Sequence, residues 1–183
     1  MKKILLSLAA VGLSAVAAPA AHASDGTITF MGRLVDQTCT IKVNGVAGPT
    51  QTVILPAVSI NLLQAATNTA GQTGFTIGLE GCTVVSGLAH AFFESGPGVD
   101  PLSGNLIQME TTGAATNIQL QLLDALSGQP IKAGDSGQSL DTTPVTIDAA
   151  GTATLPYAVQ YYATGPTTPG FVTGQVTYSI FYE

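Results

Sequence analysis

The sequence predicts an all-β protein, a β-sandwich of about seven to nine short strands. Apolar residues recur at every second position in short stretches, and turns rich in Gly and Pro separate these stretches. Such a period of two is typical of half-buried strands. Only residues 60–66 show a pattern that would suit a helix, of one or two turns. Evenly spaced strands with almost no helix favour two packed sheets.

The chain begins with a predicted secretory signal peptide, residues 1–23. Two lysines precede an apolar run from Ile4 to about Ala18, followed by Pro19 and the small-residue triplet Ala21-His22-Ala23. An N-terminal membrane anchor is the alternative, because residues 4–21 are almost long enough to span a bilayer. Pro19 and the Ala-x-Ala site favour cleavage after Ala23 instead. Cleavage leaves 160 of the 183 residues, the size of a single domain.

Residues 24–34 are predicted to form an N-terminal arm. On one face of an extended strand lie Gly26, Ile28, Phe30, Gly32 and Leu34, and on the other lie Thr27, Thr29, Met31 and Arg33. After Leu34 the apolar phase moves to the odd positions Val35, Cys39, Ile41 and Val43. A shift by one residue exchanges the two faces of a strand. We therefore expect residues 24–34 and the domain of residues 35–183 to serve different packing surfaces.

Within this domain, strands are expected between successive turn signals. Asn44-Gly45 and Gly48-Pro49 mark turns, and a short apolar run at 53–55 ends at Pro56. Alternation then predicts strands around 75–79, 89–93, 106–109, 118–122 and 155–161, with a short edge strand at 145–147. Residues 124–130 and 148–151 read as turns, and the polar stretch 133–143 as a surface loop or edge hairpin.

The last strand is the most distinctive stretch. Large apolar residues occupy Val176, Tyr178, Ile180 and Tyr182, with polar Gln175, Thr177 and Ser179 between them and Phe181 as the one exception. A strand at the end of a chain has no following strand to pair with one of its edges, and unpaired backbone groups are costly. The missing partner must come from an earlier part of the chain or from another molecule.

Two cysteines, Cys39 and Cys82, are present. In an exported chain we expect them to form one disulfide bond, with a metal pair or free thiols as the alternatives. Zinc is disfavoured, because the mature chain has a single histidine, His90, to assist two thiols. A bridge between them would restrict the unfolded chain by about 4 kcal/mol on the loop-entropy estimate.

Charge and composition argue against several functions. The mature chain has three basic and eleven acidic residues, a formal charge of −8, so it lacks the basic patch that nucleic acid requires. No nucleophile motif, phosphate-binding loop or metalloprotease motif occurs, so we expect neither an enzyme nor a bound cofactor or metal. His90 is read as a strand residue rather than a base. Asp135, Asp141 and Asp148 are read as turn residues rather than a calcium site.

Taken together, these features resemble the type 1-type pilins of the bacterial chaperone–usher pathway, over the whole mature chain. The matching features are the signal peptide, the arm Gly-x-Ile-x-Phe-x-Gly-x-Leu before Cys39, Leu55-Pro56, the spacing from Phe75 to Cys82 and Tyr161-Tyr162-Ala163-Thr164-Gly165. The terminal strand is the most specific match. Gly170 is fourteenth from the end and Tyr182 is penultimate, which are hallmarks of that family's chaperone-recognition strand.

The resemblance implies an immunoglobulin-like sandwich that lacks its last strand. A periplasmic chaperone would lend a strand to the open groove, and at the outer-membrane usher the arm of the next subunit would replace it, a mode of strand addition known from pilins. It implies that Gly26, Ile28, Phe30, Gly32 and Leu34 are donor-strand residues. Gly170, Val176, Tyr178, Ile180 and Tyr182 would form the acceptor groove and recognition strand, and Cys39 and Cys82 would join two strands.

The function expected from this resemblance is a structural subunit that polymerises with its own kind into a surface fibre for cell adhesion. The arm before Cys39 is fifteen residues long, short for a main shaft subunit, so a minor, adaptor or tip-associated subunit with a carbohydrate-binding role remains the alternative. A tip adhesin normally carries a further lectin domain and no arm. An exported enzyme on a sandwich scaffold is a third reading, for which the sequence offers no catalytic set.

Overall fold

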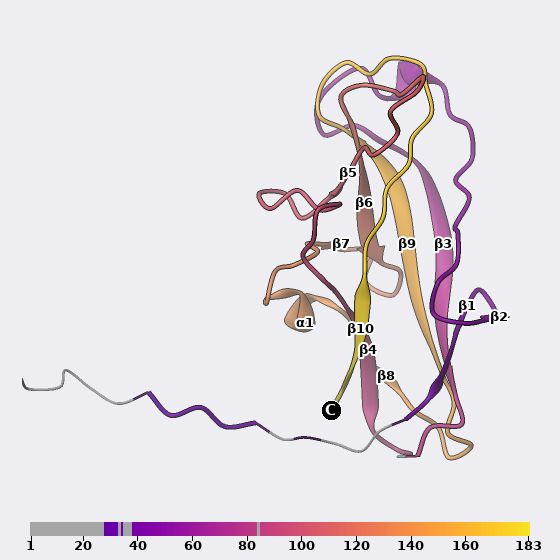
Figure 1. The fold of residues 1–183 in the computed structure, drawn as a ribbon, viewed down its shortest axis with the longest axis vertical. Helices are drawn as coiled ribbons and strands as arrows, with labels where there is room; N and C mark the ends of the chain where they lie inside the picture. Colours follow the sequence, from indigo (N-terminus) through magenta and orange to yellow (C-terminus); the bar gives the residue numbers. More distant parts are fainter. Residues whose placement is uncertain (1–27, 33, 35–37, 84) are drawn as a thin grey trace, which may run out of the picture. The chain divides into compact units, whose positions relative to one another are not determined.

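The computed structural model describes residues 28–32, 34, 38–83 and 85–183. The chain divides into two units, residues 1–34 and 35–183. The predicted signal peptide, Gly26, Arg33 and the junction at 35–37 lie outside the described residues. The larger unit carries the regular secondary structure (Figure 1).

Ten strands and two short helices make up the described part of the larger unit. The strands are β1 (Thr40–Val43), β2 (Val46–Ala47), β3 (Thr69–Glu80), β4 (Leu88–Phe93), β5 (Leu106–Ile107), β6 (Ile118–Asp124), β7 (Pro130–Ile131), β8 (Val145–Thr146), β9 (Ala153–Ala163) and β10 (Tyr178–Tyr182). The helices are the 3₁₀ turn η1 (Ile60–Leu62) and α1 (Gln138–Asp141). Helix is confined to short turns, as the sequence predicted.

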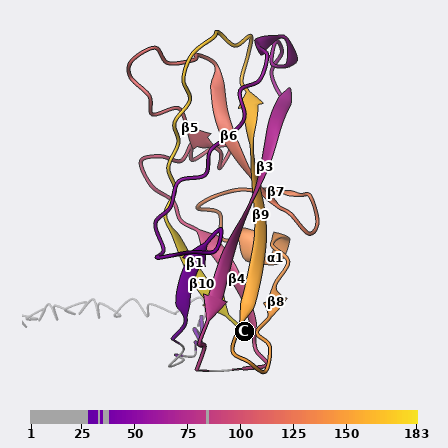
Figure 2. The ribbon, with the colours of Figure 1, turned by 90° about the vertical axis from the view of Figure 1, so that its right-hand side faces the viewer.

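These strands form two sheets. The larger has the order β2-β1-β3-β9-β6-β5, with β7 also paired to β6, and the smaller has the order β10-β4-β8. Every pairing between these strands is antiparallel. Long β3 and β9 run side by side through the larger sheet, while β10 and β4 lie together at the other side of the domain (Figures 1 and 2). The architecture is the predicted β-sandwich.

The larger of two apolar clusters joins the two sheets. It contains Ile77 and Leu79 of β3, Leu120 and Leu122 of β6, Leu155, Tyr157 and Val159 of β9, and Ala89, Ala91 and Phe93 of β4. Each set recurs at every second position, because alternate residues of a strand share one face. Phe93 meets Tyr157 edge to face, with ring centroids 5.1 Å apart. The alternation that predicted these strands therefore marks the side chains that pack between the sheets.

The expected disulfide is present. Cys39 precedes β1 and Cys82 follows β3, and their Cα atoms lie 4.2 Å apart. The two strands pair antiparallel with Thr40 opposite Glu80, so the bridge closes the end of this ladder. An ion pair between Lys42 and Glu80, with 2.7 Å between Nζ and Oε2, lies beside it. The first strand of the domain is thereby fixed to the sheet.

The polar stretch 133–143 is more ordered than a surface loop. It contains α1, and the side chain of Gln138 on this helix is 1% exposed. Its amide oxygen accepts a hydrogen bond from the Phe93 N–H at 2.8 Å, and its amide nitrogen donates to the Phe93 carbonyl at 2.8 Å. One side chain thus takes the place of a pairing strand beside β4. One other element is shorter than expected, because 108–109 join no strand, and the apolar run 53–55 also lies outside the strands.

We expect Gln138→Leu to lower the free energy of unfolding by about 1–3 kcal/mol, because it leaves a buried N–H and C=O of Phe93 without these partners. Leu140→Gln, on the same helix at a residue that is 90% exposed, is the matched control and should change stability by less than about 0.5 kcal/mol. Guanidinium unfolding of the purified protein, followed by circular dichroism, measures both. Equal midpoints for the two variants would show that the Gln138 bridge contributes nothing.

Candidate functional site

The C-terminal segment, residues 171–183, has two faces along its whole length. Side chains at the even positions from 172 to 182 are half-buried, whereas those at 171, 173, 175, 177, 181 and 183 are exposed. Val172, Val176, Tyr178, Ile180 and Tyr182 pack against the core. The period of two predicted for this stretch is confirmed, and it extends beyond β10, which covers only Tyr178–Tyr182.

One edge of this segment is bonded and the other is open. Glu183 and Leu88 exchange two backbone hydrogen bonds, of 2.9 and 3.1 Å. In an antiparallel ladder such pairs recur at every second residue, so the odd residues of β10 bond to β4. The N–H and C=O groups of Tyr178, Ile180 and Tyr182 therefore point to the opposite edge. No strand among the described residues pairs with that edge, since β10 ends the smaller sheet.

An apolar strip lies beside this edge and faces the core, and its side chains are only half-buried. We define the open strip as the half-buried residues Val172, Val176, Tyr178, Ile180 and Tyr182 of the C-terminal segment with Ile41, Val53 and Leu55 from the beginning of the domain, all of which pack against the core. Two tyrosine hydroxyls link these parts. Tyr178 Oη donates to the Pro49 carbonyl at 2.9 Å, and Tyr182 Oη lies 3.5 Å from Cys39 Sγ.

The open strip leads to a cavity of about 200 Å³, the terminal cavity. Its lining includes Val58, Leu63, Ile118, Tyr161, Thr167 and Val172. The Thr167 hydroxyl is buried and has no hydrogen-bond partner among the described residues. Ile60 of η1 and Gly170, just before the C-terminal segment, also line this cavity, so it lies at the end of the segment opposite to Tyr182. η1 itself lies at one pole of the domain (Figures 1 and 2).

Gly170, the predicted hallmark residue, also lines the terminal cavity, and its environment explains why it is a glycine. A Cβ atom at this position would lie 2.3 Å from the Ala115 nitrogen and 2.6 Å from the Gly113 carbonyl oxygen. Phe171, the next residue, exchanges hydrogen bonds with the same stretch, donating to Gly113 and accepting from Ala115. The C-terminal segment can lie this close to residues 113–115 only without a side chain.

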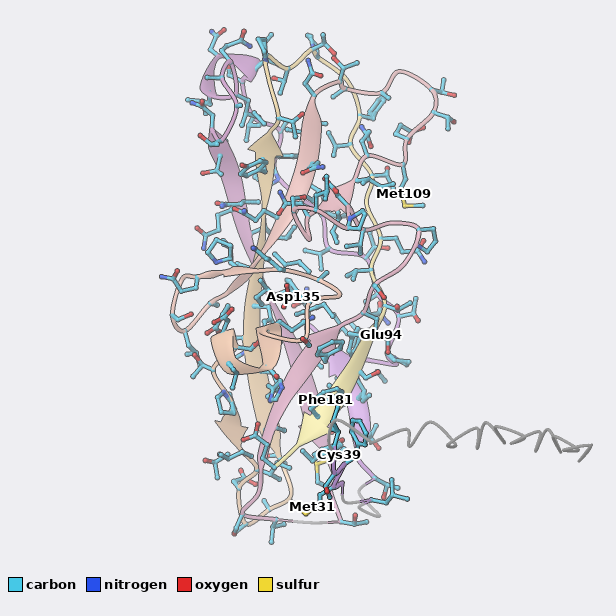
Figure 3. All side chains as sticks on the ribbon, turned by 90° about the vertical axis from the view of Figure 1, so that its left-hand side faces the viewer. Met31, Cys39, Glu94, Met109, Asp135 and Phe181 are labelled. Carbon is cyan, nitrogen blue, oxygen red and sulfur yellow. A yellow bond between two sulfur atoms is a disulfide. The ribbon has the colours of Figure 1, made fainter. Side chains whose placement is uncertain are left out.

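On the outer face, Glu94 anchors β10 to the end of β4. Its carboxylate accepts hydrogen bonds from the hydroxyls of Thr177, at 2.8 Å, and of Ser179. These bonds hold the pKa of Glu94 below its ordinary value, the Ser179 bond contributing most. Figure 3 shows Met109, Glu94 and Phe181 following one another along the C-terminal segment. No sequence pattern indicates this anchor, because Glu94 is 83 residues from Thr177.

His90 lies opposite Phe181 in this ladder and is 1% exposed. Phe181 stacks on Phe92, with ring centroids 4.8 Å apart. Neither nitrogen of the His90 ring has a hydrogen-bond partner among the described residues, and Nδ1 is 3.7 Å from Glu183 Oε1. Burial lowers the pKa of His90, and the Glu183 carboxylate opposes this shift. The residue is a strand histidine, as predicted, that is held neutral.

The predicted donor-strand residues belong to the smaller unit. Exposure is 79% for Ile28, 88% for Phe30 and 101% for Leu34, so three large apolar side chains in period two are uncovered. Gly32 has no atom near its Cβ position, and Gly26 lies outside the described residues. The predicted acceptor residues Val176, Tyr178, Ile180 and Tyr182 come together in the open strip, with Gly170 at its end.

Groups that could hold a metal ion are absent from the described part of the chain. Asp148 accepts hydrogen bonds from Ala150 and Thr152 within its own turn, as a turn residue does. Within the same part, no helix is long and apolar enough to cross a membrane.

The domain is a β-sandwich whose last strand, β10, has an edge with no pairing strand among the described residues, beside a half-covered apolar strip. Comparison with known proteins identifies the family. The family described as "FimA: Type-1 fimbrial protein, A" matches residues 55–183. The chain is 45% identical to the major fimbrial subunit SMF-1 of Stenotrophomonas maltophilia, over 91% of this chain and 98% of that protein. It is 41% identical to the F17 fimbrial protein of Escherichia coli, over 93% and 94%.

Solved structures agree on the fold. The rod subunit PapA of the P pilus has a TM-score of 0.58 and 18% identity, covering 79% of this chain and 99% of that one. A subunit from a chaperone–usher pilus structure also has a TM-score of 0.58, with 20% identity and coverage of 91% and 100%. The chain belongs to the type-1 fimbrial protein family and has its immunoglobulin-like fold. It is a structural subunit of fimbriae, not an enzyme.

The buried His90 predicts a pH dependence of stability. Because its folded pKa lies below 6.5, the unfolded chain binds more protons between the two pKa values, and stability rises with pH in that window. We therefore expect the free energy of unfolding to fall from about pH 7.5 to about pH 5.5, with a slope of at most about 1.4 kcal/mol per pH unit. Guanidinium unfolding at several pH values measures this slope.

His90→Phe should flatten this window, because the carboxylates with lowered pKa titrate at more acidic pH. Glu183→Gln keeps the histidine and removes the carboxylate that opposes the shift, so this comparison variant should keep the slope and extend it toward lower pH. An unchanged slope in His90→Phe would assign the pH dependence to other groups.

Proposed function

We propose that the chain is the main shaft subunit of an extracellular fimbria and that it polymerises by donor-strand exchange. In this mechanism, residues 24–34 of one subunit add a strand to the open edge of β10 in the next. The observation that carries the proposal is the unpaired edge of β10 beside a half-covered apolar strip. The exposed row Ile28, Phe30 and Leu34 in the same chain supplies a complementary strand.

The energies agree with such a joint. Burying Ile28, Phe30 and Leu34 contributes roughly 5–9 kcal/mol at about 1.5–3 kcal/mol per side chain. Backbone hydrogen bonds to the open edge add about 0.5–1.5 kcal/mol each. Ordering the arm opposes this by about 1–2 kcal/mol per residue. A stable joint therefore requires a preformed strip and most of the arm's hydrogen bonds.

Export would depend on the signal peptide, and assembly would depend on the open edge of β10. The signal peptide of residues 1–23 would direct the chain to the periplasm, and the mature domain would begin at residue 35 after the arm of residues 24–34. An unpaired apolar edge is prone to aggregation, so a periplasmic chaperone would cover it until the outer-membrane usher exchanges the chaperone for the next arm. The completed homopolymer would lie on the bacterial surface, where it contributes to cell adhesion.

The similarity to a major fimbrial subunit, 45% over nearly the whole chain, favours the shaft over a minor position. A tip-associated subunit that binds carbohydrate is the second candidate from the sequence. A glycan array probed with the subunit, its strip filled by a covalently fused arm peptide, tests that candidate. Binding by this completed monomer would favour it.

We expect Phe30→Asp to abolish fibres while export to the periplasm continues. A carboxylate at this position would be buried in the strip without a partner, at a cost on the order of several kcal/mol. Met31→Asp places the same charge on the opposite face of the arm and is the matched control, which should still form fibres. Electron microscopy and the yield of sheared fibres measure the result. Normal fibres from Phe30→Asp would refute donor-strand exchange through this arm.

A further inference from the structure

The first part of the C-terminal segment lies outside β10 and is held by few backbone hydrogen bonds. Phe171 is bonded to the stretch 113–115, and the Met109 N–H donates to the Thr173 carbonyl at 2.8 Å. The backbone N–H and C=O of Gln175 make no hydrogen bond with the described residues. The path of this part of the chain therefore depends on a small number of contacts.

The half-buried side chain of Gln108, just after β5, makes two of these contacts. Its Oε1 accepts a hydrogen bond from the Thr173 N–H at 2.9 Å, and its Nε2 donates to the Phe171 carbonyl at 2.6 Å. Oε1 also accepts from the Glu110 N–H at 3.1 Å, and Nε2 donates to the Ala115 carbonyl at 3.4 Å. Two N–H donors thus meet the oxygen and two carbonyls meet the nitrogen, so one orientation of the amide satisfies all four bonds.

These bonds orient the backbone of Val172, which lies between the two anchored residues. Its peptide bonds are trans, and in a trans peptide the C=O and the N–H point in opposite directions. The Phe171 carbonyl points to Gln108, so the Val172 N–H points to the open edge. The Thr173 N–H also points to Gln108, so the Val172 carbonyl points to the open edge as well. Val172 therefore presents a donor and an acceptor there, as a residue in an antiparallel ladder does.

The two anchored groups differ in how much they depend on Gln108. The Phe171 carbonyl also accepts a hydrogen bond from the Ala115 N–H at 3.0 Å. The Thr173 N–H, in contrast, has Gln108 Oε1 as its one partner among the described residues. Removing the amide would therefore free the peptide group between Val172 and Thr173, and the Val172 carbonyl would no longer be held at the open edge.

Packing restrains the backbone less at Val172 than at the glycines on either side. A Cβ atom on Gly174 would lie 2.9 Å from Leu120 Cδ1 and 3.4 Å from Leu106 Cβ, so these leucines raise the floor of the strip there. At Gly170 the stretch 113–115 lies equally close. Beside Val172 lies the terminal cavity, which leaves about 200 Å³ of space. Hydrogen bonds must therefore hold the backbone where packing does not.

We propose that Gln108 is a positioning residue for strand addition, because it holds Val172 in the geometry of a paired strand before an arm arrives. This inference rests on the donor-strand exchange proposed above. An edge that is correctly formed for only a fraction of the time captures a strand more slowly in proportion to that fraction. Once an arm is bound, its own hydrogen bonds hold Val172. Gln108 should therefore matter more for capture than for the finished joint.

A fluorescent peptide with the sequence of residues 24–34 tests the proposal on the purified mature chain. In excess over the subunit, the peptide competes with the arms of other subunits, and its anisotropy follows capture and release. We expect Gln108→Met, which keeps the length of the side chain without its amide, to lower the association rate constant about three- to ten-fold. The release rate, measured with an excess of unlabelled peptide, should change by less than about two-fold.

Gln121→Met is the matched control. It makes the same change on β6, where Gln121 accepts a hydrogen bond from Gln160 at 2.9 Å, far along the chain from the C-terminal segment. Both rates should stay at their wild-type values. If Gln108→Met does not fold, as judged by circular dichroism, Gln108→Ala is measured instead and judged by the same criterion.

The outcomes separate this role from the mechanism of assembly. A wild-type subunit that does not capture the peptide would contradict donor-strand exchange through this arm. Capture by the wild type, with an unchanged association rate in Gln108→Met, would overturn the role of Gln108 alone. A loss of affinity that lies mainly in the release rate would also overturn it, because Gln108 would then stabilise the finished joint rather than prepare the open edge.

Discussion

The unpaired backbone N–H and C=O groups along one edge of β10 are the constraint on which the other features of this domain depend. The inner face of the segment already contributes Val176, Tyr178 and Ile180 to the core, so the segment cannot detach without uncovering apolar surface. Its outer edge nevertheless has no pairing strand among the described residues. The strand that closes the smaller sheet thus buries side chains on one face while the backbone groups along its edge have no strand partner, which is costly wherever water is excluded.

The opposite edge of this small sheet shows how the same need is met within the chain. Beyond the reach of short β8, the Ala91 N–H donates to the buried Tyr157 hydroxyl at 2.7 Å. The Phe93 N–H and C=O bond to the Gln138 amide, and Gly134 N–H adds a second donor to the Phe93 carbonyl. Side chains and a loop therefore replace a strand on that edge. Within the smaller sheet, backbone groups therefore lack partners along the edge formed by β10, whereas those at the other edge of β4 are bonded.

Sequence patterns predicted the part of the fold that depends on alternation. The strands around Ile77, Leu155 and Tyr178 follow directly from apolar residues at every second position. Contacts between polar residues distant in sequence could not be predicted this way: Gln138 beside Phe93 and Glu94 below Thr177 depend on how loops return to the sheet. For the site, the rows of the arm and the last strand were visible in sequence, whereas the terminal cavity and the close packing around Gly170 and Gly174 required coordinates.

The arm and the strip differ in what they specify. Alternating apolar residues determine which face of the arm is buried, but a shift by two residues preserves that face. Register therefore depends on distinct positions, and the C-terminal segment offers two: a raised floor at Gly174 and a cavity beside Val172. Both depend on shape. A polymer that repeats one joint benefits from more than one such feature, because a single joint in the wrong register would displace every subunit added after it.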